Sequence, residues 1–454
     1  MEFSNNTFDK KRDKDRSSSV SKSKDWKQVI GLVLPSSESC GGFQKSHDFG
    51  PFGAILKKKI KDLFWNFFHT YNPYTVGYDG AIITSSKIWE ISGHLEKFFD
   101  WSVDCLKCKK RQRISLDKSS NLDKPLEKFI CSRCSSSEYS KPYRYSLLLT
   151  TNLGNQQGYL RPETCQGIFS NVFSIQRAIR QQLPFGVVQI GKSFRNEVTL
   201  NHGIFRSREF EQMELEFFCL PTEANRWWEY WIQKAWTFLK KLLAPHTNYN
   251  LVQTDYNTNF DERIKKEFLK KEELPHYAQK TLDFYFQYSF GWGELCSNSD
   301  RGVYDLQQHF PSSPLTQVIE VSFGVERLLL AILENCYTYP VMRFSPLIAP
   351  YFVAILAIFP RYQQTSWEIF QFLLTKILPF EITHEKSSSV GKGYYYQDSL
   401  GTFFCLTVDQ QTLIDQTVTV RYRDSKEQER IAQEDLEDFL RNKYQDYYKK
   451  FFSS

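Results

Sequence analysis

The chain has 454 residues, more than a single hydrophobic core usually supports, so we expect two or three domains. Hydrophobic residues make up 41% and charged residues 24%, as in water-soluble globular proteins. No apolar run approaches the ~20 residues that a membrane-spanning helix needs, and no membrane association is expected. The net charge of +6 permits a polyanionic partner but does not require one, because nucleic-acid binding depends on how basic residues cluster.

Residues 1–25 and the cysteines indicate where the protein works. Residues 1–25 are rich in Lys, Arg, Asp and Ser and lack an apolar stretch, so we expect a disordered tail and no secretory signal. The acidic residues of this tail also argue against a transit peptide. The cysteines are too sparse for a disulfide scaffold, which favours a reducing, cytoplasmic location.

The first predicted elements are a helix and short strands. Apolar residues at helical spacing predict a helix from Pro51 to Tyr71. Four lysines of this helix are expected to face water: Lys57, Lys58, Lys59 and Lys61. Residues 81–84 and 145–150 are typical of short strands.

The middle of the chain predicts a sheet with covering helices. Residues 185–190 and 213–218 predict two antiparallel strands joined by a long polar turn. Helices are predicted over 227–243 and 260–280, within a helical insertion at about 222–285. Residues 317–321 predict a strand that leads into an apolar helix from Gly324 to Leu333.

The pattern changes after Ala349. An apolar run at 352–359 precedes a predicted helix over 367–377, and residues 403–408 and 417–420 are typical of strands. This alternation predicts a separate α/β domain, with its boundary between Pro340 and Pro350.

Three segments carry residue types suited to nucleotide chemistry. Residues 194–214 are dense in Arg, Glu and Phe, and arginine presents a planar fork of donors that matches phosphate oxygens. A sheet edge with paired surface charges is the alternative. Residues 319–327 run from a strand into a helix through Gly324, and Arg327 lies in the first helical turn, where the helix dipole disfavours a cation. A polyphosphate partner or simple exposure would each explain that position. Residues 161–169, on their own, indicate only the start of a helix.

Together these segments resemble the three motifs of class II aminoacyl-tRNA synthetases, and in detail those of the glycyl-tRNA synthetases. The similar segments are 49–53, 161–169, 190–197, 206–218, 291–295 and 416–421. The resemblance extends from about Ile30 to about Ile431. It implies an α+β protein, with an antiparallel β-sheet catalytic domain and its helices over 26–344. A C-terminal α/β anticodon-binding domain over 345–454 would follow.

The resemblance also implies an activity and its partners. A member of this family is a glycine–tRNA ligase: it uses ATP with Mg²⁺ to form glycyl-adenylate and transfers glycine to the 3′ end of tRNA(Gly), as a homodimer. Because glycine is the smallest amino acid, a tight pocket can exclude its competitors sterically, and no editing domain is expected.

The implied site residues are carried over by motif. Arg195 would contact the α-phosphate, Arg327 the γ-phosphate, and Glu294 the metal; these three are the implied catalytic residues. The implied ATP-binding residues are Arg195, Asn196, Glu197, Phe205, Arg206, Ser207, Arg208, Glu209, Phe210, Glu294, Leu295, Gly324, Val325, Glu326 and Arg327. The implied glycine-binding residues are Arg113, Glu163, Phe210, Glu211, Gln212, Met213, Glu214, Glu320, Val321, Ser322, Phe323 and Gly324.

Two Cys-x-x-Cys pairs lie in an insertion at about 101–140. Cys105 and Cys108 are separated from Cys131 and Cys134 by 22 residues, close to zinc-ribbon spacing, which predicts a structural Zn²⁺. A family module that no longer binds metal is the alternative. The basic residues beside the first pair either contact tRNA phosphates or form a solvated face.

The sequence departs from the family pattern at several positions. Ser86 stands where a proline is usual in the dimer-forming motif, and Val321 and Glu326 replace a proline and an aspartate. The stretch from Gly391 to Asp398 has lost basic residues and gained three tyrosines, which either stack on unpaired bases or fill the core.

Two other functions are less consistent with the sequence. A non-catalytic, glycyl-synthetase-like nucleic-acid-binding accessory protein should lack the phosphate-binding arginines, yet Arg195, Arg206 and Arg327 are all present. A class II synthetase for another amino acid is disfavoured by the carboxylates Glu163 and Glu214.

Overall fold

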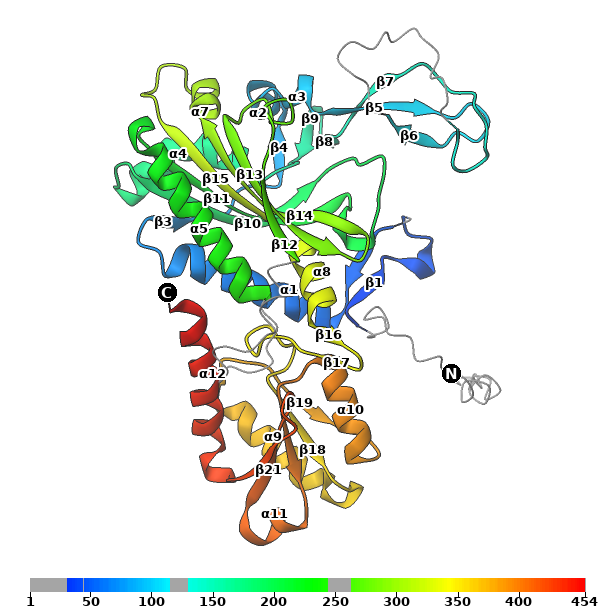
Figure 1. Ribbon diagram of the computed structural model, residues 1–454, viewed down its shortest axis with the longest axis vertical. Coiled ribbons are helices and arrows are strands. Elements are labelled where there is room, and N and C mark those ends of the chain that lie inside the picture. Colours follow the sequence, from blue (N-terminus) through cyan, green and yellow to red (C-terminus); the bar gives the residue numbers. More distant parts are fainter. Residues whose placement is uncertain (1–30, 44, 115–129, 244–262, 454) are drawn as a thin grey trace.

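Figure 1 shows the computed structural model, which describes residues 31–43, 45–114, 130–243 and 263–453. A large sheet with its helices forms one end of the molecule, and a smaller sheet formed by the C-terminal part forms the other. The predicted tail at 1–25 lies outside the described residues. Within the described ranges, no helix combines the length and the apolar character needed to cross a bilayer.

The large sheet has seven strands in the order β12-β13-β14-β15-β11-β10-β3. Its strands are β3 (Thr75–Gly77), β10 (Phe185–Phe194), β11 (Glu209–Cys219), β12 (Ile264–Phe268), β13 (Lys280–Tyr288), β14 (Gly291–Gly302) and β15 (Gln317–Gly324). All neighbours pair antiparallel except β10 and β3. The predicted antiparallel pair is confirmed, with Phe185 opposite Phe218 and Phe194 opposite Glu209.

Helices cover both faces of this sheet. On one face lie α1 (Pro51–Trp65), α5 (Ala224–Leu243) and α8 (Val325–Cys336). In α5 the buried residues Trp227, Trp231 and Phe238 recur at helical spacing, so one stripe packs on the sheet. On the opposite face lie α4 (Cys165–Ile179) and α7 (Tyr304–His309), packed against Phe185 and Val187.

Two of the sequence-based predictions were wrong. Within the described part of residues 260–280 there is no helix: β12 and β13 extend the sheet instead, so the described residues 263–285 of the predicted helical insertion contain strands. Lys265, Lys266 and Glu267 lie on β12, the edge strand of the sheet, where charged side chains prevent pairing with other chains. In the sequence, such a run of charged residues resembles the exposed face of a surface helix. Residues 145–150 belong to two strands rather than one.

Smaller elements border the large sheet. They are β1 (Val33–Pro35) with β2 (His47–Phe49), β4 (Ile83–Ser85) with β9 (Gln156–Leu160) and β8 (Leu149–Leu153), and β6 (Arg111–Arg113) with β5 (Phe99–Asp104) and β7 (Tyr143–Ser146). The short helices α2 (Ser86–Ile91) and α3 (His94–Lys97) precede β5. Single helical turns lie at Glu38–Cys40, Asn66–Thr70, Gly203–Phe205, Pro221–Glu223, Pro360–Tyr362 and Gln433–Asp435.

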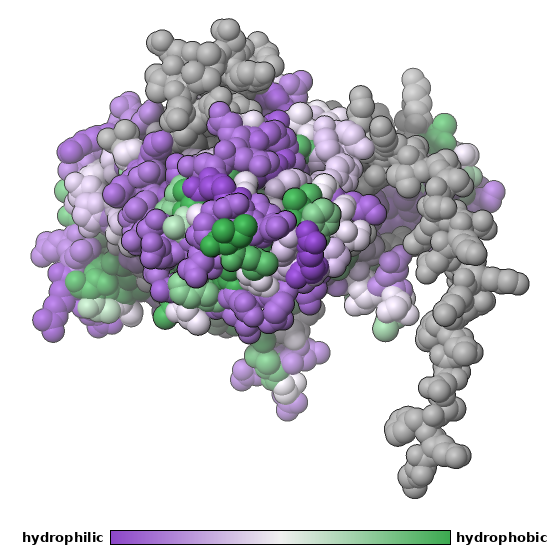
Figure 2. All heavy atoms as spheres, turned by 90° about the horizontal axis from the view of Figure 1, so that it is seen from below, coloured by the Kyte–Doolittle hydropathy of each residue, from purple (hydrophilic) through white to green (hydrophobic). Residues whose placement is uncertain are grey.

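The C-terminal part contains a five-stranded sheet in the order β19-β18-β20-β21-β22, preceded by the hairpin of β16 (Tyr337–Thr338) and β17 (Val341–Met342). Its strands are β18 (Val353–Ala357), β19 (Ile382–Glu385), β20 (Phe404–Val408), β21 (Thr417–Tyr422) and β22 (Gln428–Ala432). Its helices are α9 (Gln363–Thr375), α10 (Val390–Leu400), α11 (Gln410–Asp415) and α12 (Leu436–Phe452). The predicted α/β character is confirmed. Figure 2 views the molecule from this end and shows a mostly hydrophilic face with separate apolar patches.

Candidate active site

A cleft of about 380 Å³ lies on the face of the large sheet that faces away from α1, α5 and α8. Strand alternation builds it, because successive side chains of a strand point to opposite faces. In β11, Gln212 and Glu214 line the cleft, whereas Met213 and Leu215 are buried under the helices.

The cleft gathers most of the residues expected in the site. Those that line it are Glu163, Arg195, Glu197, Phe205, Arg206, Ser207, Phe210, Gln212, Glu214, Glu294, Glu320, Ser322, Gly324, Glu326 and Arg327. Four others, Asn196, Arg208, Glu209 and Glu211, line an adjoining cavity of about 1130 Å³ that shares Phe210 with the cleft.

Six expected residues do not bring their side chains to either cavity. Met213, Leu295, Val321, Phe323 and Val325 are buried in the apolar core, because they occupy the helix-facing positions of the strands or the start of α8. Arg113 lies on β6, where its half-exposed side chain pairs with Asp100 at 3.0 Å.

Three arginines line the cleft. The Arg195 guanidinium lies between the rings of Phe98 and Phe210, at 5.4 and 5.3 Å, and its Nε donates to the carbonyl oxygen of Pro162 at 3.0 Å. Arg206 Nε donates to Glu197 at 2.9 Å. These contacts hold cationic groups in fixed positions in a partly buried site, as binding of a polyphosphate requires.

The third arginine, Arg327, contacts two other cleft residues. Its Nη1 lies 2.9 Å from Glu294 Oε1, and its guanidinium lies 4.7 Å from the centre of the Phe205 ring. Glu294 therefore balances the charge of Arg327.

Asp283, which the sequence analysis missed, lies next to Glu294. Its Oδ1 is buried and has no hydrogen-bond partner among the described residues. Burial and the neighbouring Glu294 raise the pKa of Asp283 to about 6. Two carboxylates that repel each other beside the arginines of the cleft form a donor set suited to a divalent cation. The alternation over 281–286, directly after the wrongly predicted helix at 260–280, is the signal that would have identified Asp283.

Carboxylates around a single buried arginine form the acidic end of the cleft. Arg301 Nη1 donates to Glu320 at 2.7 Å, and its Nε and Nη2 donate to Asp305 at 2.7 and 2.9 Å. Glu163 and Glu214 complete this acidic end. The sequence analysis missed Arg301 and Asp305, because nothing local distinguishes them from surface charges.

The protonation of these carboxylates differs because their surroundings differ. Burial raises the pKa of Glu320 to about 7 and also raises the pKa of Glu214. Burial opposes ionisation of Glu163 too, but His94 and Arg301 hold its pKa below the ordinary value. Glu216, whose carboxylate oxygens have no partner among the described residues, has a strongly raised pKa because of its burial. The acidic end is thus suited to receive a cation, which would replace bound protons.

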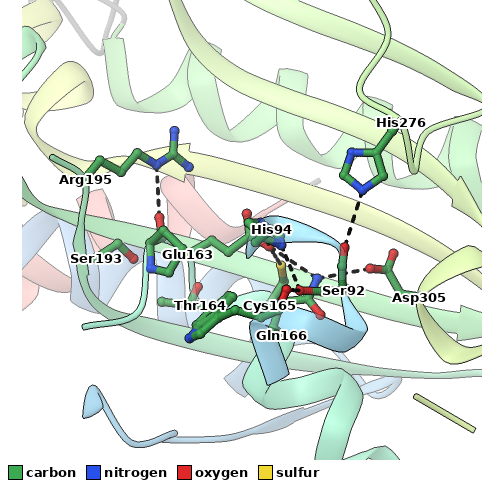
Figure 3. A network of polar contacts seen from close by, with 12 residues as sticks. Ser92, His94, Glu163, Thr164, Cys165, Gln166, Ser193, Arg195, His276 and Asp305 are labelled. Atoms are coloured by element: carbon green, nitrogen blue, oxygen red, sulfur yellow. Dashed lines mark hydrogen bonds and ion pairs between the residues drawn. The ribbon is translucent and has the colours of Figure 1, made fainter. Parts of the chain in front are cut away.

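A network of polar contacts supports the acidic end (Figure 3). Gln166 Nε2 donates to Glu163 Oε1 at 3.3 Å and to Asp305 Oδ1 at 3.1 Å. Thr164 donates through its backbone N–H and its hydroxyl to Glu214 Oε2.

Lys57 of α1 is buried, contrary to the prediction that it faces water. Its Nζ lies 2.6 Å from Glu326 and 2.7 Å from Glu211, and Glu326 also accepts from the Glu211 backbone N–H at 2.9 Å. Lys59 is buried as well and donates to the carbonyl oxygen of Ala349 at 2.7 Å. Helical periodicity identified the apolar face of α1 but not the second surface, from β11, α8 and the C-terminal part, that covers its polar side.

The four cysteines of the two pairs converge on one point. Their Sγ atoms all lie within 4.8 Å of one another, with Cys105 and Cys134 at 3.5 Å and Cys108 and Cys131 at 3.6 Å. Tetrahedral Zn²⁺ with ~2.3 Å bonds requires sulfur separations of roughly 3.8 Å.

The two pairs also share one turn geometry. The backbone N–H of Lys109 donates to the carbonyl oxygen of Cys105 at 2.9 Å, and that of Ser135 donates to Cys131 at 2.8 Å. Lys109 and Ser135 both have positive φ, 58° and 56°. Two equivalent turns that aim four thiols at one point fit a metal centre.

Comparison with known proteins agrees with this geometry. Residues 150–336 match the family model of the tRNA synthetase class II core domain (G, H, P, S and T), and residues 353–443 match that of an anticodon binding domain. The fold and the cleft therefore define a class II aminoacyl-tRNA synthetase.

Similar sequences indicate which family within this class the chain belongs to. A glycine–tRNA ligase of Mycoplasma capricolum is 39% identical over 460 residues, covering 91% of this chain and 96% of the relative. One of Geobacillus thermodenitrificans is 37% identical, covering 91% of this chain and 95% of the relative. The chain belongs to the glycine–tRNA ligase family. A crystal structure of prolyl-tRNA synthetase from Cryptosporidium parvum shares the fold, with a TM-score of 0.60 at 12% identity, over 94% of this chain and 78% of that one.

Proposed function

We propose that the protein activates glycine with ATP and transfers it to the 3′ end of tRNA(Gly). One observation carries this proposal: three arginines and a carboxylate cluster line a single cleft. An amino acid aligned with ATP has the complementary charges, because its ammonium group faces the carboxylates while its carboxylate meets the phosphates near the arginines.

The reaction needs positioning and charge neutralisation rather than a covalent catalyst. The glycine carboxylate attacks the α-phosphorus in line, and pyrophosphate leaves. We assign the α-phosphate to Arg195, the outer phosphates to Arg206 and Arg327, and the adenine ring to Phe210. These charged groups are held in place before substrate binds, which is the arrangement that stabilises charge developing in a transition state.

A divalent cation accompanies ATP in this proposal. Glu294 and Asp283 would hold Mg²⁺, and the unpartnered, buried Oδ1 of Asp283 supports this assignment. The bound ion would supply charge neutralisation on the phosphate oxygens.

The remaining parts have separate tasks. The four cysteines would hold a structural Zn²⁺, which their two equivalent turns support. Residues 345–454 would bind the anticodon of the tRNA. Of the three tyrosines in α10, Tyr394 packs inward and contacts Thr407 at 2.6 Å, whereas Tyr395 and Tyr396 are 55% and 44% exposed and suited to base stacking.

The protein would work in the cytoplasm as a homodimer. Exposed apolar side chains on the β4-β9-β8 sheet, such as Ile83 and Leu153, support an interface there.

Ser86 is the first residue of α2, which is capped by the Ser85 side chain, so this segment is helical without the usual proline. Light scattering during gel filtration tests the assembly state.

The decisive experiment is ATP–pyrophosphate exchange with each of the twenty amino acids, comparing the wild type with Arg195→Ala. We expect exchange that requires glycine and is lost in the variant. Exchange with serine or alanine in place of glycine would refute the substrate assignment. No exchange with any amino acid, from folded protein with Mg²⁺, would favour a non-catalytic nucleic-acid-binding relative.

A further inference from the structure

A serine, a histidine and a glutamate form a line of hydrogen bonds behind the acidic end of the cleft (Figure 3). Ser92 Oγ lies 2.8 Å from His94 Nδ1, and His94 Nε2 lies 3.3 Å from Glu163 Oε1. Ser92 and His94 are 2% and 4% exposed. They come from the segment that joins α2 to β5, outside the large sheet, and the proposed chemistry assigns them no task.

The charge of Glu163 determines the direction of its hydrogen bond with His94. An ionised carboxylate can only accept hydrogen bonds, and the surroundings of Glu163 hold its pKa below the ordinary value. His94 Nε2, which lies 3.3 Å from Glu163 Oε1, must then carry a proton, while Nδ1 faces the Ser92 hydroxyl at 2.8 Å. His94 therefore donates to Glu163.

The side-chain contacts of Glu163 involve one of its two carboxylate oxygens. Its Oε1 accepts from His94, from Cys165 Sγ at 3.1 Å and from Gln166 Nε2 at 3.3 Å. All hydrogen bonds that the described residues make to Glu163 end on Oε1. Glu163 also lines the cleft, so Oε2 remains for a donor that enters from there.

The histidine ring itself is fixed. It lies between Trp89 and Phe98, each with a ring-centre distance of 5.3 Å. Gly93 precedes it with φ of 79°, a conformation that permits the sharp turn between α2 and α3. The direction of Nε2 toward Glu163 is thus determined by packing.

We propose that His94 is a positioning residue for amino-acid recognition: it holds Glu163 ionised and oriented, with Oε2 directed at the ammonium group of glycine. This inference rests on the proposed function, because that function supplies the ammonium group. It adds a residue outside the sheet to the determinants of glycine binding.

Two variants of His94 test the proposal. In His94→Gln the amide nitrogen reaches the place of Nε2, whereas in His94→Asn it reaches only the place of Nδ1, near Ser92. We expect His94→Asn to raise the KM for glycine about 10- to 100-fold, the effect of losing one hydrogen bond to a charged group, with the KM for ATP changed less than about twofold. His94→Gln should stay within about fivefold of the wild type. His69→Asn serves as the matched control, because His69 bonds the Thr75 carbonyl oxygen and contacts Trp65 edge-on, with a ring-centre distance of 4.8 Å.

A double variant tests whether His94 acts through Glu163. Glu163→Gln with His94→Asn should bind glycine no more weakly than Glu163→Gln alone, because the oriented carboxylate is already lost. A purely structural role predicts additive losses and equal changes in both KM values, and that result would overturn the proposal. So would an unchanged glycine KM in His94→Asn. A wild type without glycine-dependent exchange would instead refute the proposed function, and this inference with it.

Discussion

The buried Lys57 gives a prediction whose size follows from its surroundings. Replacing it with methionine keeps most of its volume but leaves Glu326, whose side chain is 6% exposed, without a cation, while Glu211 keeps its ion pair with Lys61 at 2.8 Å. Removing one partner of a buried ion pair typically costs about 3–5 kcal/mol. We therefore expect Lys57→Met to lower the free energy of unfolding by about that amount.

Lys58 on the same helix is the matched control. Its side chain is 68% exposed and pairs with Asp62 one turn away, an arrangement worth about 0.5 kcal/mol or less. Urea unfolding, followed by the fluorescence of the buried tryptophans of α5, measures both variants. A double-mutant cycle with Glu326→Gln isolates the pair, and the cost of Lys57→Met should fall in that background.

The same variant should lower activity, because Glu326 directly precedes Arg327 and its contact with the Glu211 backbone joins α8 to β11. Equal effects of Lys57→Met and Lys58→Met on stability, or a cost below about 1 kcal/mol for the first, would refute the argument from burial.

Four further predictions concern other parts of the molecule. Burial raises the pKa of Glu320 from its ordinary 4.5 to about 7, so its contribution to stability is complete below pH 4.5 and is lost as the pH rises through 7. Between pH 5 and 8 the glycine-free protein should lose up to about 3 kcal/mol, and Glu320→Gln should remove that dependence, as urea unfolding at each pH would show. Asp283→Asn should raise the Mg²⁺ concentration for half-maximal exchange about tenfold, and an unchanged Mg²⁺ requirement would exclude Asp283 as a ligand. Metal analysis should find about one Zn²⁺ per chain, and less than about a tenth of an ion would contradict the cysteine centre. Replacing Tyr395 and Tyr396 by alanine should raise the KM for tRNA by about tenfold in aminoacylation while leaving ATP–pyrophosphate exchange unchanged; a parallel fall in exchange would point to misfolding.

The sequence predicted the elements whose pattern is local. The strand pair β10–β11 and the helix α8 follow from runs of apolar residues bounded by polar or glycine-containing turns. The convergence of Arg195, Arg206 and Arg327 in one cleft came from the family resemblance, because no local pattern brings strands so far apart in the chain together.

What the sequence analysis missed depends on contacts between distant segments. Arg301 is a surface-like charge in the sequence, and only its pairing with Glu320 across β14 and β15 makes it part of the site. Every residue of a motif segment was also predicted to lie in the site. In a strand, however, successive side chains point to opposite faces, so Val321 and Phe323 are in the core while Ser322 faces the cleft. Lys57 was misplaced because periodicity shows which helix face is apolar, but not what covers the opposite face.

The last helix has a consequence for how the chain is made. Phe451, near the end of α12, is 2% exposed and lies among Phe67 and Phe238 of the first domain's core, at ring-centre distances of 6.3 and 6.1 Å. Lys241 of α5 donates to the carbonyl oxygen of the same phenylalanine at 2.8 Å. A ribosome adds residue 451 only after the entire C-terminal sheet, so the core beneath the cleft stays incomplete until the residues of that sheet and of α12 have been synthesised. During synthesis, Phe67 and Phe238 of the first domain therefore lack their contact with Phe451 until α12 has been made.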